Sequence, residues 1–113
     1  MPKSANKKSS DPFDKFIFEK GLRATQVVIN KKFNLLVIIL NNGKVLRIFL
    51  SDYKKLQKAS QSQLDKWKLT GDGIGIQWTE IDEDLSLKGM IKTAAMSAAL
   101  HSMESKGDFG TIS

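Results

Sequence analysis

Residues 34–50, NLLVIILNNGKVLRIFL, decide the fold of this chain. Two apolar runs rich in Val, Ile, Leu and Phe flank Asn42-Gly43, the strongest short-range signal for a β-hairpin that a sequence can carry. A two-residue turn at Asn42 and Gly43 pairs Leu40 with Val45 and thereby fixes the pairing of all residues behind them. The stretch predicts two antiparallel strands in one register.

This register sorts the hairpin side chains into two faces, because side chains alternate in direction along a strand. One face is wholly apolar and holds Leu35, Val37, Ile39, Leu46, Ile48 and Leu50. The other face is interrupted only by Arg47 and otherwise holds Leu36, Ile38, Leu40, Val45 and Phe49. If only one face of the sheet packed against the core, the other apolar face would be exposed to water. We therefore expect both faces to be covered.

The length of 113 residues and the apolar content of 41% suit one compact domain with short appendages. The chain has no cysteine, which excludes disulfides, thiolate catalysis and cysteine-ligated metals. Its longest apolar run, residues 35–40, is far shorter than the ~20 residues that span a bilayer. The basic N-terminus has no apolar stretch behind it and so does not resemble a signal peptide. We therefore expect a cytoplasmic protein.

The net charge of +6 is unevenly distributed along the chain. Residues 24–51 carry four basic side chains and no acidic one, whereas residues 80–89 carry four acidic side chains against Lys88. A basic body can attract nucleic acid or an acidic partner. Surface charge of this size also serves simply to keep a small domain soluble.

The chain divides into a polar tail over residues 1–10, expected to be disordered, and an N-terminal extension over residues 11–23. Asp11-Pro12 is typical of a helix start, and Phe13, Phe16 and Ile17 follow at helical spacing. Gly21 would end this helix with a left-handed cap. A short strand over residues 16–18 is the alternative. As a helix, the aromatic stripe is a natural lid for the second face of the hairpin.

Residues 24–103 are predicted to form a single α+β domain, followed by a frayed tail over residues 104–113. The expected elements are a strand over 24–30, the hairpin, two short helices, a turn over 71–75, a strand over 74–78 and a final helix from Leu87 to about Met103. Ser60 is the predicted cap of the second short helix, and Ser86 or a preceding aspartate that of the last. The predicted fold is a mostly antiparallel sheet of about four strands with helices packed on it.

No catalytic or metal-binding pattern stands out against a structural explanation. Asp82 and Asp84 could offer oxygen ligands to a hard cation, but the further ligands of an EF-hand are absent, and carboxylates are also favourable before a helix start. The glycines of residues 71–75 lack the strand–loop–helix context of a nucleotide fingerprint. His101 has no acidic or nucleophilic companion nearby in the sequence. We therefore expect no enzyme activity, no cofactor and no metal.

Four blocks of the sequence resemble a known bacterial family. They are the hairpin with Asn42-Gly43, LSDYKKLQKAS (50–60), QLDKWKLTGDGIGIQW (63–78) and IDEDLSLKGMI (81–91). Together they are similar to domain of unknown function 2442, over residues 24–91. The resemblance implies a small α+β domain, and an antitoxin-like or accessory-subunit role, since some members are encoded beside small toxin-like proteins. No catalytic residues are implied, and the first 23 residues are not explained by the family.

The sequence thus predicts a small non-catalytic protein-interaction module that binds a protein partner or a second copy of itself. The residues expected to form the interaction surface are Phe13, Phe16, Leu36, Ile38, Leu40, Val45 and Phe49. The alternative is a nucleic-acid-binding or regulatory domain, in which Trp67 and Trp78 stack on bases. The basic contacts would then be Lys54, Lys55, Lys58, Lys66 and Lys68. Neither a membrane nor a small-molecule substrate is expected.

Overall fold

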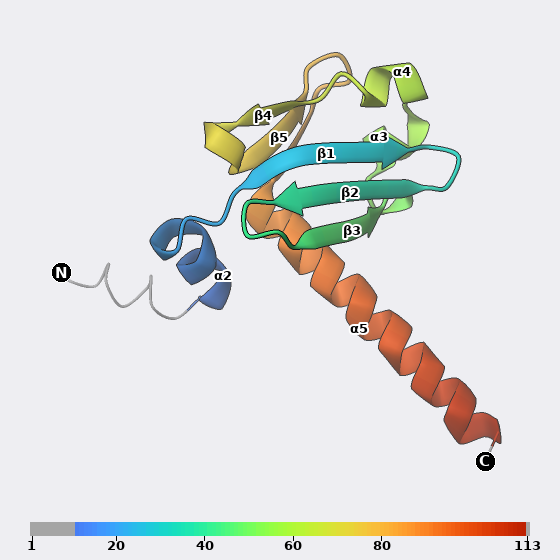
Figure 1. Ribbon diagram of the computed structural model, residues 1–113. Helices are drawn as coiled ribbons and strands as arrows, with labels where there is room; N and C mark the ends of the chain where they lie inside the picture. Colours follow the sequence, from blue (N-terminus) through green and yellow to red (C-terminus); the bar gives the residue numbers. More distant parts are fainter. Residues whose placement is uncertain (1–10, 113) are drawn as a thin grey trace.

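The computed structural model describes residues 11–112, with side chains up to Met103 (Figure 1). Two three-stranded antiparallel sheets combine with several short helices and one long C-terminal helix. The α+β class is confirmed, but the prediction of about four strands in one sheet was wrong. The predicted disordered tail over residues 1–10 lies outside the described residues.

The first sheet has the strand order β1-β2-β3 and follows the predicted boundaries closely. Its strands are β1 (Ala24–Asn30), β2 (Leu35–Leu40) and β3 (Val45–Phe49). Both pairings are antiparallel. The dense β-branched composition of these runs explains why the strands could be placed from the sequence.

The predicted register of the hairpin was wrong by one residue. β2 pairs with β3 as Val37 with Arg47 and Ile39 with Val45, so Ile38, the predicted partner of Arg47, instead faces Leu46. Because side chains alternate along a strand, a one-residue shift regroups the faces of the hairpin. The buried face now combines even-numbered residues of both strands, and the opposite face combines odd-numbered ones.

The cause is a three-residue loop in place of the two-residue turn. The Leu40 amide donates to the Lys44 carbonyl (2.9 Å) and the Gly43 amide donates to the Leu40 carbonyl (3.0 Å), with Gly43 at φ 87°. A left-handed residue at the third loop position is typical of such hairpins. Asn41 joins the loop because it is held elsewhere: its amide donates to the Arg23 carbonyl (2.8 Å) and its side-chain oxygen accepts from the Arg23 amide (3.0 Å).

The second sheet has the order β4-β5-β6 and packs the most buried aromatic residue of the described chain. Its strands are β4 (Lys68–Thr70), β5 (Gly75–Trp78) and β6 (Glu83–Ser86). Only β5 was predicted. β4 and β6 are only three and four residues long, and β6 begins with two acidic residues, so their strand structure comes from pairing with β5 and not from local propensity. Trp78 is fully buried, and its indole N–H donates to the Leu64 carbonyl (2.9 Å).

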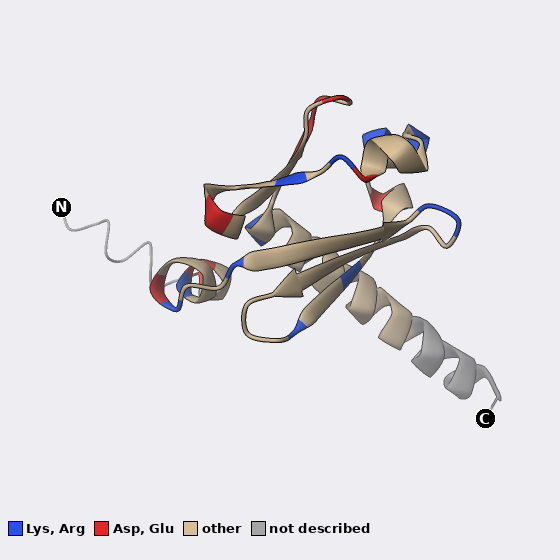
Figure 2. Ribbon diagram, turned by 45° about the horizontal axis from the view of Figure 1, so that its top comes forward, with Lys and Arg blue, Asp and Glu red and all other residues tan. Residues whose placement is uncertain are grey.

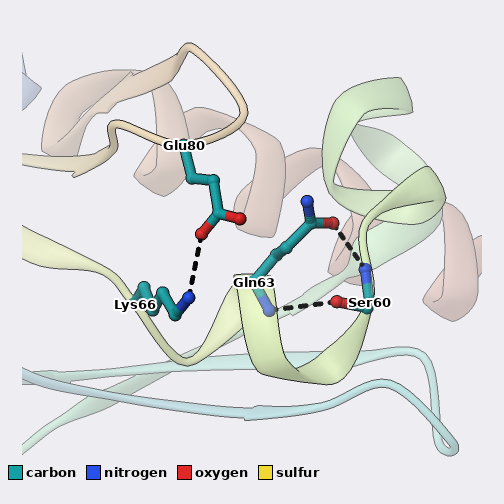
Figure 3. A network of polar contacts seen from close by, with 4 residues as sticks. All are labelled: Ser60, Gln63, Lys66 and Glu80. Carbon is teal, nitrogen blue, oxygen red and sulfur yellow. Dashed lines mark hydrogen bonds and ion pairs between the residues drawn. The ribbon is translucent and has the colours of Figure 1, made fainter.

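The helical segments connect and cover these sheets. They are α2 (Pro12–Asp14), η1 (Lys15–Glu19), η2 (Leu50–Asp52), α3 (Lys54–Lys58), α4 (Gln61–Leu64), η3 (Gly71–Gly73) and α5 (Leu87–Ile112). Ser60 caps α4 as predicted, through a reciprocal pair of hydrogen bonds with Gln63 (Figure 3). Ser86 caps α5 by accepting from the Gly89 amide (3.0 Å). α5 continues beyond Met103, where its end was predicted; the fraying of residues 104–113 stays a prediction.

The N-terminal extension is helical, so the alternative of a strand over residues 16–18 was wrong. Asp11 accepts from the Phe13 amide (2.9 Å), and Gly21 has the predicted left-handed backbone, at φ 71°. The helical turns lie beside the start of α5, not over the hairpin as the predicted lid (Figure 1). Ile17 enters the core, whereas Phe16 is half exposed.

Gly73 provides a test of this packing, with Gly43 as a matched control. Both glycines have positive φ, but a Cβ at Gly73 would overlap the backbone of Ala24 in β1, whereas a Cβ at Gly43 would meet open space. We expect Gly43→Ala to lower the free energy of unfolding by about 1 kcal/mol through backbone strain alone. Gly73→Ala should cost about 3 kcal/mol or more, because η3 must also move off β1. Equal losses in urea titrations would contradict this contact.

Candidate interaction surface

The outer face of the first sheet is apolar and lies away from the core. The pairing places its side chains in three rows across the strands: Gln26, Ile39 and Val45; Val28, Val37 and Arg47; Asn30, Leu35 and Phe49. Six of these nine residues are apolar. Val28, Val45 and Phe49 remain 48%, 49% and 49% exposed. No helix or strand of the described chain lies in front of this face in Figure 1, where α5 begins behind it.

A groove continues this face at the edge strand β3. Its volume is about 660 Å³. One wall comes from the sheet, with Leu35, Arg47, Ile48 and Phe49, and the other from α5, with Ala94, Ser97, Ala98, Leu100 and His101. The outer face and the groove therefore form one continuous surface, hereafter the outer surface.

The part of α5 that borders the groove carries a second apolar stripe. Leu87, Met90 and Ala94 face the core, whereas Met96, Leu100 and Met103 lie on another side and are more than half exposed. Residues 93–103, TAAMSAALHSM, contain no Asp, Glu, Lys or Arg. A helix that is apolar on more than one side normally has a partner on each.

Arg47 is the one charged side chain among the nine residues of the three rows. It is exposed, and it forms no ion pair with a carboxylate of the described residues. The remaining charged residues between 24 and 51 are Lys31, Lys32 and Lys44, all basic. Figure 2 accordingly shows blue segments and no red ones along β1–β3 and their loops. The outer surface is thus apolar with a positive surround.

The structure separates the seven residues predicted for the interaction surface. Leu36, Ile38 and Leu40 are buried in the core, with 0%, 0% and 5% of their surface exposed, so they are not available to a partner. The physical reason is the shifted register, which turns them inward. Val45 and Phe49 lie on the outer surface. The residues that the sequence assigned to the opposite face, Leu35, Val37 and Ile39, take the other places, together with Val28 of β1.

Phe13 is held at a different place, beside α5, and Phe16 follows it in η1. Lys88 forms ion pairs with Asp11 (2.7 Å) and Asp14 (2.9 Å), and the Lys92 ammonium lies 5.7 Å from the centre of the Phe13 ring. The hydrogen bond from Lys88 holds the pKa of Asp11 below its ordinary value, and Asp11 together with Asp14 raises the pKa of Lys88. These contacts attach the N-terminal extension to the start of α5.

The five lysines proposed for nucleic-acid contact lie on three different segments, and two of them pair with carboxylates. Lys54, Lys55 and Lys58 are on α3, Lys66 precedes β4, and Lys68 is in β4. Lys66 contacts Glu80 at 3.1 Å (Figure 3), and Lys55 lies 3.9 Å from Asp82. These carboxylates belong to the turn between β5 and β6. The tryptophans do not form a stacking platform, because Trp78 is fully buried and Trp67 is half-buried against the core.

The described residues contain no arrangement typical of catalysis. No group of three potential metal ligands comes together among them, the acidic residues 80–84 included. Ser97 and His101 share the groove, but no hydrogen bond joins them and no carboxylate is among the residues that line it. Tyr53 has a pKa raised mainly by burial, and its hydroxyl donates to Thr93 (2.9 Å) in a contact that fixes the start of α3 to α5. The absence of enzyme activity stays a prediction.

The match to known proteins extends over most of the folded domain. Residues 24–95 match the family model described as a protein of unknown function, DUF2442. The chain belongs to the DUF2442 family. The match includes both sheets, the groove-forming strand β3 and the first part of α5, and it leaves out the N-terminal extension.

Two solved bacterial structures are similar to this DUF2442 protein. One is a crystal structure of a protein of unknown function from Rhodospirillum rubrum, with 28% identity and a TM-score of 0.57, over 63% of this chain and 86% of the other. The other is a solution structure of an uncharacterised protein from Chromobacterium violaceum, with 22% identity and a TM-score of 0.59, over 76% and 78%. No curated protein matches the chain. No helix of the described residues has the length and hydropathy to cross a bilayer.

The attachment of the N-terminal extension should depend on pH in both directions. Asp11 has a lowered pKa. Its contribution to the free energy of unfolding is therefore present above its ordinary pKa of 3.8 and is lost as the pH falls through the pKa of the folded state. Lys88 has a raised pKa, so its contribution is present below 10.5 and is lost as the pH rises further. We expect wild type to be more stable than Lys88→Met at pH 7, with the difference shrinking below pH 3.8. A difference in melting temperature that is constant from pH 2 to 7, or equally large for Lys15→Met, would contradict this.

Proposed function

We propose that this DUF2442 protein is a non-catalytic protein-interaction module that binds its partner through the outer surface. One observation carries the proposal: the outer face of the first sheet is apolar in six of nine positions, and Val28, Val45 and Phe49 are about half exposed. Contiguous exposed apolar surface with a polar surround is characteristic of binding sites, since it costs free energy in water. The partner supplies the missing cover.

The composition of the outer surface fits a protein partner. Protein interfaces combine an apolar, aromatic-containing centre with a polar rim and a few charged side chains such as Arg. Here Leu35 and Phe49 pack in one row, Arg47 lies in the next row, and the lysines lie in the loops around. The family resemblance supports an antitoxin-like or accessory role in a bacterial two-protein system as the biological setting.

Substitutions at two of the three half-exposed apolar positions of the outer face test the proposal. We expect the double variant Val28→Lys/Phe49→Lys to keep the circular dichroism spectrum of wild type, because both side chains are half exposed. Its affinity for the identified and purified native partner should fall at least about a hundredfold, since two apolar contacts are replaced by charges. The matched control is Phe33→Lys, at an exposed position of the β1–β2 loop, which should bind normally. A partner that binds the double variant as well as wild type would refute this surface.

Nucleic-acid binding remains the alternative proposal, supported by the net charge of +6. If the protein is a protein-interaction module, we expect no measurable affinity for duplex or single-stranded DNA or RNA at moderate salt, because Lys55 and Lys66 are paired with carboxylates. Titration of fluorescent oligonucleotides at low and moderate salt distinguishes the two. An affinity that falls steeply with salt and is lost in Lys54→Ala/Lys58→Ala would favour the alternative.

A further inference from the structure

The first sheet lacks a layer on one side. An apolar sheet face is stable in water when a helix or another sheet packs against it. The inner face of β1–β3 has this cover, because it packs into the core with Leu56, Leu87 and Met90 from the helices. The outer face has none among the described residues, although α5 borders it along β3.

The wall that α5 contributes to the groove is suited to a second helix. Ala94, Ser97 and Ala98 are small, so they leave room for another backbone beside α5. Leu35 and Phe49 on the opposite wall offer apolar contacts from the sheet. A helix lying here would cover the outer face and pack against α5 at the same time, which is the ordinary arrangement of helices on a sheet.

The positive charge of the outer surface indicates that the bound segment is negatively charged. Arg47 lines the groove between apolar residues and has no ion-pair partner in the described part of the chain. A bound apolar segment would remove water from around this guanidinium. An unpaired charge in such a place is costly, whereas a carboxylate on the occupant would satisfy it through charge-assisted hydrogen bonds. Lys44, which directly precedes β3, is also positively charged.

Neither end of this chain supplies a separate acidic segment for the groove. Residues 1–10 carry Lys3, Lys7 and Lys8 and no acidic residue, and Glu104 and Asp108 belong to the continuation of α5, which already forms one wall of the groove. A second copy meeting this face across a twofold axis would place Arg47 and Lys44 against the same basic set. Like charges across an interface disfavour association. Complementarity therefore points to a different protein.

We infer that the groove between β3 and α5 binds an acidic amphipathic α-helix of a partner protein, with its apolar side on Leu35, Phe49 and Ala98 and a carboxylate on Arg47. This inference rests on the proposed function, because it names the chemistry of the segment that occupies the outer surface. Arg47 sets the orientation and sign of the ligand, and the apolar walls provide most of the contact.

A charge-swap experiment with two probes tests it. The probes are fluorescent helical peptides of about 18 residues with the same leucine face, one with Glu and one with Lys beside that face. In anisotropy titrations the Glu peptide should bind wild type and the Lys peptide should not. Arg47→Glu should lower the affinity for the Glu peptide at least about tenfold and should allow the Lys peptide to bind. Lys32→Glu, the same charge change at a residue of the β1–β2 loop that does not line the groove, should alter the affinity for the Glu peptide less than about twofold.

Four outcomes would overturn the inference. Equal affinity for both peptides would show contacts without charge selection, and binding of neither would exclude a helix. Association with phosphatidylglycerol vesicles in the absence of peptide binding would assign the surface to a membrane. A concentration-dependent dimer in sedimentation that Phe49→Lys abolishes would assign it to a second copy. If neither peptide binds but the native partner still requires Val28 and Phe49, this inference fails while the proposed function stands.

Discussion

The pairing of β2 with β3 in one particular register is the constraint on which the rest of the structure depends. Leu36, Ile38 and Ile48 lie on one side of that ladder and are fully buried. The side chains between them point the other way and form the outer surface. A shift by one residue would exchange these roles along β2, since side chains alternate strictly. Stability and binding surface are thus fixed together by the loop over residues 41–43.

Contacts far along the chain hold that register. Asn41 bonds through its backbone and side chain to Arg23 and donates to the Gly21 carbonyl (2.9 Å). At the opposite end of the sheet, the Gln61 amide donates to the Ile29 carbonyl (3.0 Å) and accepts from the Lys31 amide (2.8 Å). Gln61 thereby satisfies part of the free edge of β1, as a neighbouring strand would. The apolar outer face is left as the exposed feature that these contacts do not cover.

Strands and helix caps could be predicted from the sequence because their signals are local. The β-branched residues of β1 and β2, the Asn-Gly loop and the caps at Asp11, Ser60 and Ser86 all depend on neighbours a few residues away. The register could not be predicted, because Asn41 leaves the strand to bond residues about twenty positions earlier. β4 and β6 were missed for the same reason. Segments of three and four residues form strands here only because they pair with β5.

The candidate site, too, could be predicted from the sequence only where it depends on local signals. Val45 and Phe49 lie on the exposed outer face, and their role in an interaction stays a prediction, whereas Leu36, Ile38 and Leu40 are buried because the predicted register was wrong. The groove itself could not be predicted, because it joins β3 to α5 across about fifty residues. A three-residue loop closed by Gly43 is the signal that would have identified Leu35, Val37 and Ile39.

Nuclear Overhauser effects between Cα protons across β2 and β3 test the central claim most directly. Residue pairs that do not exchange hydrogen bonds bring these protons closest in an antiparallel ladder. The structure predicts strong effects for Leu35 with Phe49, Val37 with Arg47 and Ile39 with Val45. Effects that instead link Val37 with Ile48 or Ile38 with Arg47 would place Leu35, Val37 and Ile39 beside different partners and contradict the account.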